Sequence, residues 1–333
     1  MLPLSEGAAA SGEGLIFVFS LPRSGSTLLQ RLLGAHPAIA TASEPWIALP
    51  QLYALRDRGV YAEYGHFAMS AAIDDFCALL PRGRADYLDA TRRYLLELYG
   101  LARGERRYFL DKSPRYHLVA GDLLELFPGA RCVVLWRQPL AVAASIVDSF
   151  AGGRWNIDKY AVDLYDGVDN LLAAERAAAG RSCTLRYEDL VADPPAELER
   201  LWRFLDLDPG EAPPLDLERV HLQGRMGDET GTAAYRSVSG EPLEKWRRTM
   251  ANPFRRWWCG RYLDWLGPAR LRAMGYDEEL LRSQVAGLGR GHERLGSDVV
   301  RAVAGYGYYR VAHRLINRPE RPLSADPRRR RSR

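Results

Sequence analysis

The chain has 333 residues, enough for one large α/β domain or two small ones, and 47% of them are hydrophobic and 26% charged, as in ordinary globular proteins. No apolar run approaches the roughly 20 residues of a transmembrane helix, and residues 1–14 lack the basic and long apolar regions of a signal peptide. The formal net charge is +4, and residues 328–333 hold five arginines, so the rest of the chain is close to neutral.

The predicted secondary structure alternates between strands and helices along the chain. Apolar runs predict short strands at 15–20, 39–43, 108–110, 131–136 and 182–187. Periodicity and helix-start signals predict helices up to residue 33, over most of 46–103, and at 117–128, 139–150, 156–180 and 195–205, with two or three more up to residue 275. Residues 207–240, rich in Gly, Pro, Asp and Thr, predict a long loop. This alternation predicts a parallel sheet in a doubly wound, three-layer α/β fold.

Polar residues follow several of the predicted strands. Because ligands of such folds bind at the carboxyl ends of the strands, these residues are the candidates for a site. They are Arg23 to Thr27, Glu44, Asp111 with Lys112, Arg137, and Tyr187 with Glu188.

The segment "FSLPRSGSTLLQ", residues 19–30, combines a strand end, a tight turn and a helix start. Backbone N–H groups of residues 24–28 can converge on an anion at the helix N-terminus, and Gly25 allows a close approach. Ser26 and Thr27 add hydroxyl donors and Arg23 adds a positive charge. The segment therefore predicts a phosphate-binding loop, although the Gly-Lys-Ser/Thr ending of nucleoside triphosphatases is missing.

The cysteines and histidines form no pattern of a metal site. The four cysteines are far apart, none forms a C-x-x-C pair, and no H-x-x-x-H or D-x-D-x-D spacing occurs. Cys132 and Cys183 lie in apolar runs and are expected in the core. We therefore expect no metal and no disulfide, and a reducing, cytoplasmic setting.

Several stretches together resemble the sulfotransferases that use 3′-phosphoadenosine 5′-phosphosulfate (PAPS). In that family a loop similar to "LPRSGSTLL" holds the 5′-phosphosulfate of the donor. An arginine after a later strand, and a serine about eight residues on, hold its 3′-phosphate; Arg137 and Ser145 have this spacing. The segment "RYEDLVADPPAELERLWRFLDL" is also similar, and the resemblance spans about residues 14–275.

The tyrosylprotein sulfotransferase branch is the most similar part of that family. There, as in "ASEPWIALP", a catalytic glutamate follows the loop, and Glu44 takes its place. A lysine in a "K-[DS]-P" element corresponds to Lys112 in "DKSPRY", and the donor-binding tyrosine corresponds to Tyr187. A later donor-binding loop corresponds to residues 230–239, followed by a Lys-Trp pair. Its candidate ligands here are Thr230, Arg236, Ser239 and Lys245.

One position departs from the family. A second arginine, usual twelve residues after the first, would fall at Ser149, and Arg236 is a candidate replacement. The resemblance otherwise implies the following site. Arg23, Ser24, Gly25, Ser26, Thr27, Arg137, Ser145 and Tyr187 bind PAPS, together with the later loop; Glu44, Lys112 and Arg23 are catalytic.

The resemblance implies sulfuryl transfer to an acceptor hydroxyl on a small molecule, a glycan or a lipid-linked compound, without a metal. Positioning and charge stabilisation would dominate such an in-line displacement. Glu44 would take the acceptor proton, and Arg23 and Lys112 would stabilise the leaving phosphate. Among the six histidines, His117 is the rival base. Trp46, Trp155, Tyr160 and Tyr165 are candidates for the acceptor pocket.

Two other functions stay open from the sequence. A P-loop kinase or nucleoside triphosphatase would use the same kind of loop, and a polyanion-binding module would use the arginine-rich tail. For partners, we expect the hydroxyl-bearing acceptor and no specific nucleic acid. A homodimer, and a weak membrane-surface contact through the C-terminal helix and the arginine tail, remain open.

The domain organisation is predicted from composition and resemblance. Residues 1–13 form a flexible N-terminus, and 14–285 form the P-loop-like α/β/α domain. Within it, residues 46–106 form a helical insertion over the acceptor site. Residues 286–320 form a helical extension, and 321–333 a disordered, arginine-rich tail.

Overall fold

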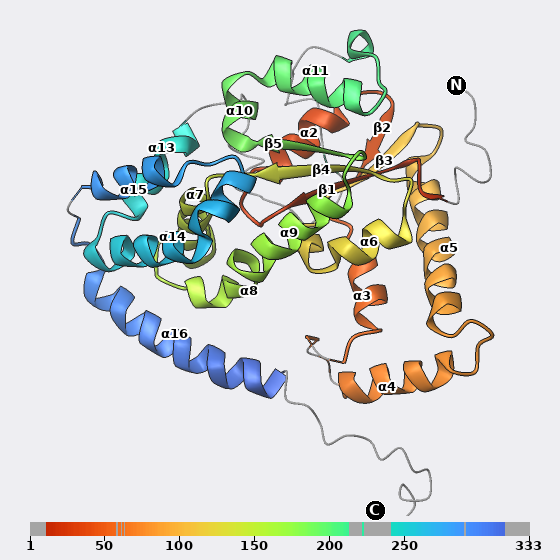
Figure 1. The fold of residues 1–333 in the computed structure, drawn as a ribbon, viewed down its shortest axis with the longest axis horizontal. Helices are drawn as coiled ribbons and strands as arrows, with labels where there is room; N and C mark the ends of the chain where they lie inside the picture. The colour runs from red at the N-terminus through yellow and green to blue at the C-terminus, as the bar shows by residue number, and fades with distance from the viewer. Residues whose placement is uncertain are drawn as a thin grey trace, which may run out of the picture.

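A five-stranded parallel sheet forms the centre of the molecule (Figure 1). This computed structural model describes residues 11–57, 59–60, 62, 64–212, 222, 241–289 and 291–316. The strands are β1 (Leu15–Ser20), β2 (Ile39–Thr41), β3 (Tyr108–Asp111), β4 (Arg131–Trp136) and β5 (Ser182–Arg186), in the order β2-β3-β1-β4-β5. Every pairing in the sheet is parallel. The predicted α/β fold with a short parallel sheet is confirmed.

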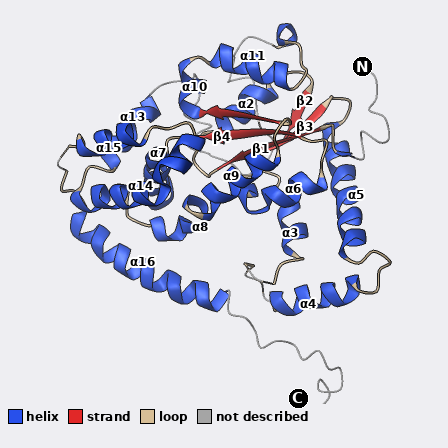
Figure 2. Ribbon diagram, in the orientation of Figure 1, coloured by secondary structure: helices blue, strands red, loops and turns tan. Residues whose placement is uncertain are grey.

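Helices cover both faces of the sheet (Figure 2). Alternate residues of β1 enter two separate cores, because successive side chains of a strand point to opposite faces. Ile16 and Val18 pack with α2 (Ser26–Gly34), α10 (Tyr187–Ala192) and α11 (Pro194–Phe204). Phe17 and Phe19 enter the larger core on the opposite face.

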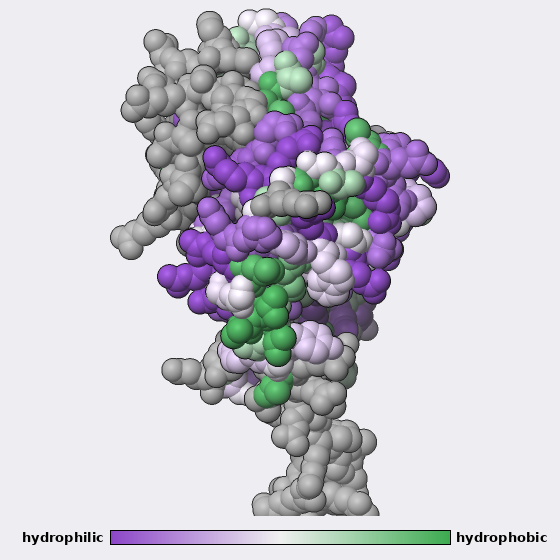
Figure 3. Space-filling view, turned by 90° about the vertical axis from the view of Figure 1, so that its left-hand side faces the viewer, coloured by the Kyte–Doolittle hydropathy of each residue, from purple (hydrophilic) through white to green (hydrophobic). Residues whose placement is uncertain are grey.

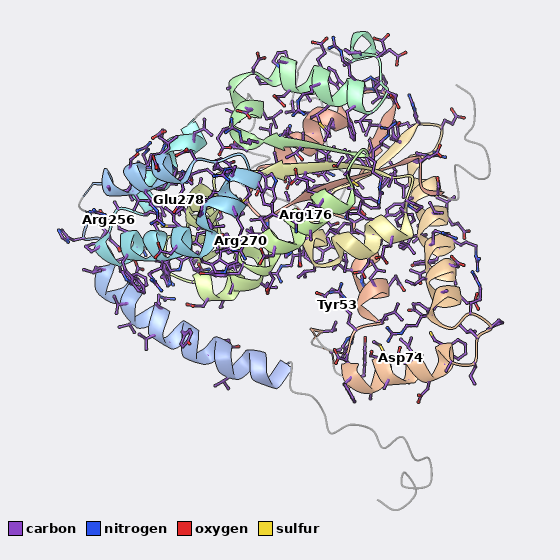
Figure 4. The ribbon with its side chains drawn as sticks, in the orientation of Figure 1. Tyr53, Asp74, Arg176, Arg256, Arg270 and Glu278 are labelled. Carbon is purple, nitrogen blue, oxygen red and sulfur yellow. The ribbon has the colours of Figure 1, made fainter. Side chains whose placement is uncertain are left out.

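The larger core is built by helices from most of the chain. It draws on α3 (Ala48–Tyr53), α5 (Arg84–Arg103), α6 (Ala120–Leu126), α7 (Pro139–Ala151), α9 (Asp166–Ala177), α13 (Glu241–Thr249), α14 (Pro253–Ala273) and α15 (Glu278–Ala286). Arg270 of α14 extends toward α9, where its Nε lies 2.7 Å from Oδ1 of Asp169 (Figure 4). The C-terminal helices are thereby tied to the sheet domain.

The remaining elements are α4 (His66–Cys77), α8 (Ala161–Leu164), α16 (Leu295–Ile316) and the 3₁₀ turns η1 (Tyr116–Val119), η2 (Ile157–Tyr160) and η3 (Pro209–Glu211). Of these, α8, η1 and η2 contribute Leu164, Tyr116 and Ile157 to the larger core. The segment 46–106 contains α3, α4 and α5, and its predicted place over the acceptor stays a prediction. Within the described ranges, no helix is both long and apolar enough to cross a bilayer.

The prediction of one continuous helix over 156–180 is wrong. The segment is divided into η2, α8 and α9, and Tyr165, between α8 and α9, has φ −107° and ψ −72°. The buried hydroxyl of Tyr262 donates to the carbonyl oxygen of Leu164 at 2.8 Å, and the ring of Tyr165 packs against Tyr262. These tertiary contacts override the local helical pattern.

Part of the predicted loop 207–240 cannot be compared with the structure. Residues 213–221 and 223–240 lie outside the described residues, and so do the donor-loop candidates Thr230, Arg236 and Ser239. Residues 1–10 and 317–333 lie outside them as well. The predictions for the two termini therefore stay predictions.

Candidate active site

The loop between β1 and α2 has the backbone geometry of an anion-binding turn. Gly25, the N-cap of α2, has φ +87°. The first intrahelical hydrogen bond runs from Leu29 N–H to the carbonyl oxygen of Gly25 at 3.2 Å. The amides of residues 25–28 therefore precede the hydrogen-bond ladder of the helix, where the positive end of the dipole favours an anion.

Gly25 also allows close packing between this loop and the end of β5. A Cβ atom at position 25 would lie 2.3 Å from Cδ2 of Tyr187. Tyr187 itself is fully buried. Glycine is thus required here for two reasons: the backbone is left-handed, and the ring of Tyr187 leaves no room for a Cβ atom.

Arg23 contacts both Ser145 and Arg137 beside the loop. Nε of Arg23 donates to Oγ of Ser145 at 3.2 Å, and Nη1 of Arg137 donates to the carbonyl oxygen of Arg23 at 2.9 Å. The guanidinium of Arg137 lies 4.5 Å from the ring centre of Tyr187. Two positive charges and a hydroxyl therefore flank the phosphate loop, a set of groups suited to a second phosphate.

Glu44 and Lys112 form a buried ion pair at the carboxyl edge of the sheet. Nζ of Lys112 lies 2.7 Å from Oε1 of Glu44, with side-chain exposures of 1% and 10%. The same Nζ lies 3.4 Å from Oγ1 of Thr27. Lys112 thus connects the phosphate loop to the candidate base across chain separations of 85 and 68 residues.

The second oxygen of Glu44 is held by Trp46. The indole Nε1–H donates to Oε2 of Glu44 at 3.2 Å, so both carboxylate oxygens have fixed partners. Trp46 has φ +59°, an uncommon backbone conformation for a bulky residue. Its amide N–H donates to Oγ of Ser113 at 3.1 Å, which stabilises this conformation.

A buried carboxylate supports the segment that carries Trp46. Oδ1 of Asp111 accepts from the hydroxyl of Ser113 at 3.0 Å, and Oδ2 accepts from Tyr99 at 2.7 Å and Tyr116 at 2.9 Å. Burial raises the pKa of Asp111 to about 6, although these three donors oppose the shift. Asp111, predicted only as a polar residue at a strand end, is therefore a central structural residue of the site.

A cavity of about 360 Å³ opens between these groups. It is lined by Pro22, Arg23, Gly25, Ser26, Thr27, Glu44, Trp46, Pro114, Arg115, Arg137, Phe150, Tyr160 and Asp163. Trp46 and Tyr160 line it, as the sequence predicts for an acceptor pocket. Trp155 and Tyr165 do not: Trp155 packs against Phe254 and Trp258 in the core, and Tyr165 against Tyr262. The cavity joins the phosphate loop, the candidate base and aromatic side chains in one space.

Sequence reasoning missed Arg115 and Asp163 in this cavity. Nη2 of Arg115 lies 2.9 Å from Oδ2 of Asp163. Arg115 could have been predicted from the sequence, since it stands three residues after the site candidate Lys112 in the same loop. Asp163 could not, because it lies in a segment that the sequence pattern predicts to be one continuous helix.

The rival base, His117, has a different environment. It is 1% exposed, and its Nε2 lies 2.9 Å from Oδ1 of Asp163. His117 is not among the residues that line the cavity. Among the two candidate bases, Glu44 lines the cavity and His117 does not.

The remaining described candidate, Lys245, lies on α13. Its Nζ is 3.8 Å from Oδ2 of Asp148, and its side chain is 55% exposed. It does not line the cavity. Its predicted contact with the donor stays a prediction.

The described residues contain no group of three or more His, Cys, Asp or Glu side chains that could hold a metal ion. The predicted independence of metal stays a prediction.

Comparisons with known proteins show which chains this one is similar to. Nodulation protein NoeE of Sinorhizobium fredii is 28% identical over 298 residues, which cover 82% of this chain and 68% of that protein. Protein-tyrosine sulfotransferase A of Caenorhabditis elegans is 24% identical over 278 residues, covering 79% and 67%. The sulfotransferase domain from the curacin biosynthetic pathway, a solved structure, has 22% identity and a TM-score of 0.47, covering 70% of this chain and 90% of that one.

The family itself is assigned by a match to more than half of the chain. The sequence model of the sulfotransferase family matches residues 16–211, a range that begins in β1 and includes the phosphate loop, Glu44, Lys112, Arg137 and Tyr187. This chain therefore belongs to the sulfotransferase family and is an enzyme of that class.

Proposed function

We propose that this enzyme transfers the sulfuryl group of PAPS to an acceptor hydroxyl, with Glu44 as the general base. The observation that carries the proposal is the position of Lys112, whose Nζ lies 2.7 Å from Glu44 Oε1 and 3.4 Å from Thr27 Oγ1. One cation thus joins the loop suited to the donor phosphate and the carboxylate suited to the acceptor proton.

The two anion-binding groups of the site support PAPS as the donor. The amides at the start of α2 suit the 5′-phosphosulfate, and Arg137 with Ser145 suits the 3′-phosphate. Nucleoside triphosphates lack a 3′-phosphate and would leave this second group unused. That difference favours PAPS over the kinase or nucleoside triphosphatase alternative.

The proposed reaction is a single displacement at sulfur. The acceptor oxygen forms a bond to sulfur while the bond from sulfur to the 5′-phosphate oxygen breaks, and adenosine 3′,5′-bisphosphate leaves. The hydroxyl proton passes to Glu44, whose oxygens retain lone pairs beyond those used by Lys112 and Trp46. Lys112, Arg23 and the loop amides stabilise the negative charge that develops on the leaving phosphate.

The cavity lining supports a hydroxyl acceptor with an apolar or ring-shaped body. Trp46, Phe150 and Tyr160 supply aromatic surface, and Arg115 with Asp163 supplies hydrogen-bonding groups. The name of the Caenorhabditis elegans relative gives protein tyrosine, a phenol, as the acceptor of that protein. A small molecule, a glycan and a lipid-linked compound all remain candidates here.

Thermal-shift titrations test the donor. Adenosine 3′,5′-bisphosphate is expected to bind near micromolar affinity, roughly 8 kcal/mol, while ATP with Mg²⁺ and heparin are expected to shift the melting temperature far less. A larger shift with ATP and Mg²⁺ would favour the kinase function, and a larger shift with heparin would favour the polyanion-binding module. An acceptor screen with sulfur-labelled PAPS, run with and without EDTA, then tests sulfuryl transfer and its independence of metal.

A further inference from the structure

The active-site cavity contains a second carboxylate, which the proposed reaction does not use. Asp163 lines the cavity although its side chain is 0% exposed. Its Oδ2 lies 2.9 Å from Nη2 of Arg115, and its Oδ1 lies 2.9 Å from Nε2 of His117. A guanidinium has several N–H donors, and the Arg115 side chain is 35% exposed. Arg115 therefore keeps donors for a bound molecule while Asp163 holds one end of it.

These three side chains together carry no net charge. The His117 ring is 1% exposed, and its Nδ1 is buried without a hydrogen-bond partner among the described residues. A proton on Nε2 is donated to Asp163, whereas a second proton on Nδ1 would be buried without an acceptor, which is costly. His117 is therefore a neutral donor, and the negative charge of Asp163 compensates the positive charge of Arg115.

The Arg115–Asp163 pair lies beside the aromatic part of the cavity. The ring of Tyr160 stacks on Phe150 with 5.0 Å between the ring centres, and both residues line the cavity. Burial raises the pKa of the Tyr160 hydroxyl, while Arg115 lowers it and Asp163 raises it, so both charges act at this point. The pair is therefore placed where the body of an acceptor would pack on the aromatic rings.

The donor leaves no positive charge over for the acceptor. The proposed reaction directs three cations at the donor phosphates: Arg23, Lys112 and Arg137. A 3′-phosphate monoester carries a charge of about −1.5 to −2 near neutral pH, and the two acidic groups of the phosphosulfate add to it, so the donor outweighs these cations. Among the residues that line the cavity, this leaves Arg115 to face the acceptor, against the carboxylates of Glu44 and Asp163. A negatively charged acceptor would be repelled there.

We propose that Asp163 determines acceptor specificity: by compensating Arg115, it selects an uncharged hydroxyl compound with a second oxygen that accepts from Arg115, and it excludes an acidic compound. This inference rests on the proposed function, because it concerns the compound that receives the sulfuryl group. An unpaired guanidinium would bind a carboxylate through charge-assisted hydrogen bonds. The buried carboxylate of Asp163, at 2.9 Å, already occupies that place and repels a second one.

Three probes of similar shape and different charge test the proposal. Tyrosol is neutral, 4-hydroxyphenylacetate carries a carboxylate and tyramine carries an ammonium group, and all three share a phenol body that suits the aromatic rings of the cavity. Ligand-observed NMR titrations near neutral pH measure their binding to the complex of the full-length protein with adenosine 3′,5′-bisphosphate, in which no sulfuryl transfer occurs. For the wild type, we expect tyrosol to bind at least about tenfold more tightly than 4-hydroxyphenylacetate.

Two variants change the charge of the pair in opposite directions. Asp163→Asn can still accept from His117 but leaves Arg115 uncompensated, so the affinity for 4-hydroxyphenylacetate relative to tyrosol should rise at least about tenfold. Arg115→Gln leaves Asp163 uncompensated and should shift the preference toward tyramine by a similar factor. The matched control is Asp169→Asn, which also removes a carboxylate from an arginine pair, with Arg270 at 2.7 Å, but does not line the cavity. It should leave both ratios unchanged.

Comparison of affinity ratios separates binding in the cavity from binding to the surface. Figure 3 shows hydrophobic residues gathered in a stripe on one side of the molecule, and Val300 and Val303 of α16 are 68% and 71% exposed. An aromatic probe would also contact such a surface. Contacts there do not depend on the Arg115–Asp163 pair, so a change in the ratio between variants reports on the cavity.

Several outcomes would overturn the proposal. Equal or tighter binding of 4-hydroxyphenylacetate by the wild type would show that Arg115 serves an anionic acceptor. An unchanged ratio in both variants would reduce the pair to a structural role, because a structural defect weakens all three probes alike. Absence of binding by all three probes, in a protein that binds adenosine 3′,5′-bisphosphate, would place the acceptor elsewhere. Failure to bind that nucleotide at all is a separate result, which would refute the proposed function itself. Circular dichroism verifies folding, and if Asp163→Asn does not fold, the direction of the shift in Arg115→Gln decides.

Discussion

Glu44 illustrates how single residues of this site are fixed by their neighbours. A base that must accept a proton from a bound hydroxyl gains from a fixed orientation, because misplacement lowers the rate steeply. Lys112 and Trp46 hold one oxygen each, and the strained backbone of Trp46 is held by Ser113. Arg23, which lines the same cavity, also has a strained backbone, with φ +69°. A strained backbone conformation persists only where contacts with the surrounding structure hold it in place.

Replacing Glu44 by glutamine tests the base. Glutamine retains an oxygen that can accept from Lys112, but it cannot take the acceptor proton. We expect kcat to fall about 10²–10⁴-fold, the usual contribution of a general base. Affinity for adenosine 3′,5′-bisphosphate should change less than about threefold, well under 1 kcal/mol, since the loop amides and Arg137 remain. Steady-state kinetics and a thermal-shift titration measure the two effects.

The control for this variant is Glu125→Gln, at an exposed position on α6. It should leave both kcat and donor affinity unchanged. Near-normal activity of Glu44→Gln together with inactivity of His117→Asn would identify the histidine as the base.

Arg137 offers a second test at the residue scale, of the 3′-phosphate. Loss of a charge-assisted hydrogen bond costs about 1.5–3 kcal/mol, so Arg137→Ala should weaken adenosine 3′,5′-bisphosphate roughly 10–100-fold. Adenosine 5′-phosphate should be weakened much less, through the lost contact with the carbonyl of Arg23. Isothermal titration of both nucleotides gives the ratio. Equal weakening of the two would contradict the assignment of Arg137.

Among the structural elements, the turn between β1 and α2 determines the geometry of the donor site. Gly25→Ala would place a methyl group against the ring of Tyr187 and would force a side chain into φ +87°. We expect a loss of stability of about 1–3 kcal/mol and a clear loss of affinity for adenosine 3′,5′-bisphosphate.

Gly121→Ala in α6 is the matched control, because no atom lies within 4 Å of its added Cβ. That change should be neutral or stabilising by up to about 1 kcal/mol. Urea unfolding and nucleotide titration compare the two variants, and equal effects would contradict the packing argument.

The sequence is informative about elements whose signal is local. Buried strands are continuous apolar runs, and the phosphate loop carries its residues side by side, so both could be predicted. The proximity of Glu44, Lys112 and Thr27 could also be predicted, because the carboxyl ends of parallel strands lie along one edge of the sheet. The break at Tyr165 could not be predicted, because a hydroxyl of α14, about a hundred residues away, determines it. The strained conformation of Trp46 likewise depends on Ser113, in a different loop.

For the molecule as a whole, Asp111 joins parts of the chain that are otherwise separate. Its carboxylate links β3 to α5 through Tyr99 and to η1 through Tyr116. The hydroxyl of Tyr116 in turn accepts from the amide of Ala48 at the start of α3. Ser113 extends the network to Trp46. The stability of the fold and the geometry of the active site therefore depend on the same buried group.

The raised pKa of Asp111 predicts how global stability changes with pH. Its pKa is about 6 in the folded state and 3.8 in a model peptide, so between these values the native state binds the extra proton. The contribution of this group to the free energy of unfolding is complete below about pH 4 and is lost as pH rises through 6. At 1.36 kcal/mol per pKa unit, the change is about 3 kcal/mol.

Urea unfolding across this range measures the change for the wild type and for Asp111→Asn, which can keep both tyrosine contacts without a titratable proton. Other carboxylates also titrate in this window, so the difference between the two proteins is the informative quantity. The free energy of unfolding of the wild type, relative to the variant, should fall by about 3 kcal/mol from pH 3 to pH 7. A constant difference would contradict the raised pKa, and a rising one would mean that the buried hydrogen bonds outweigh desolvation and lower the pKa of Asp111 instead.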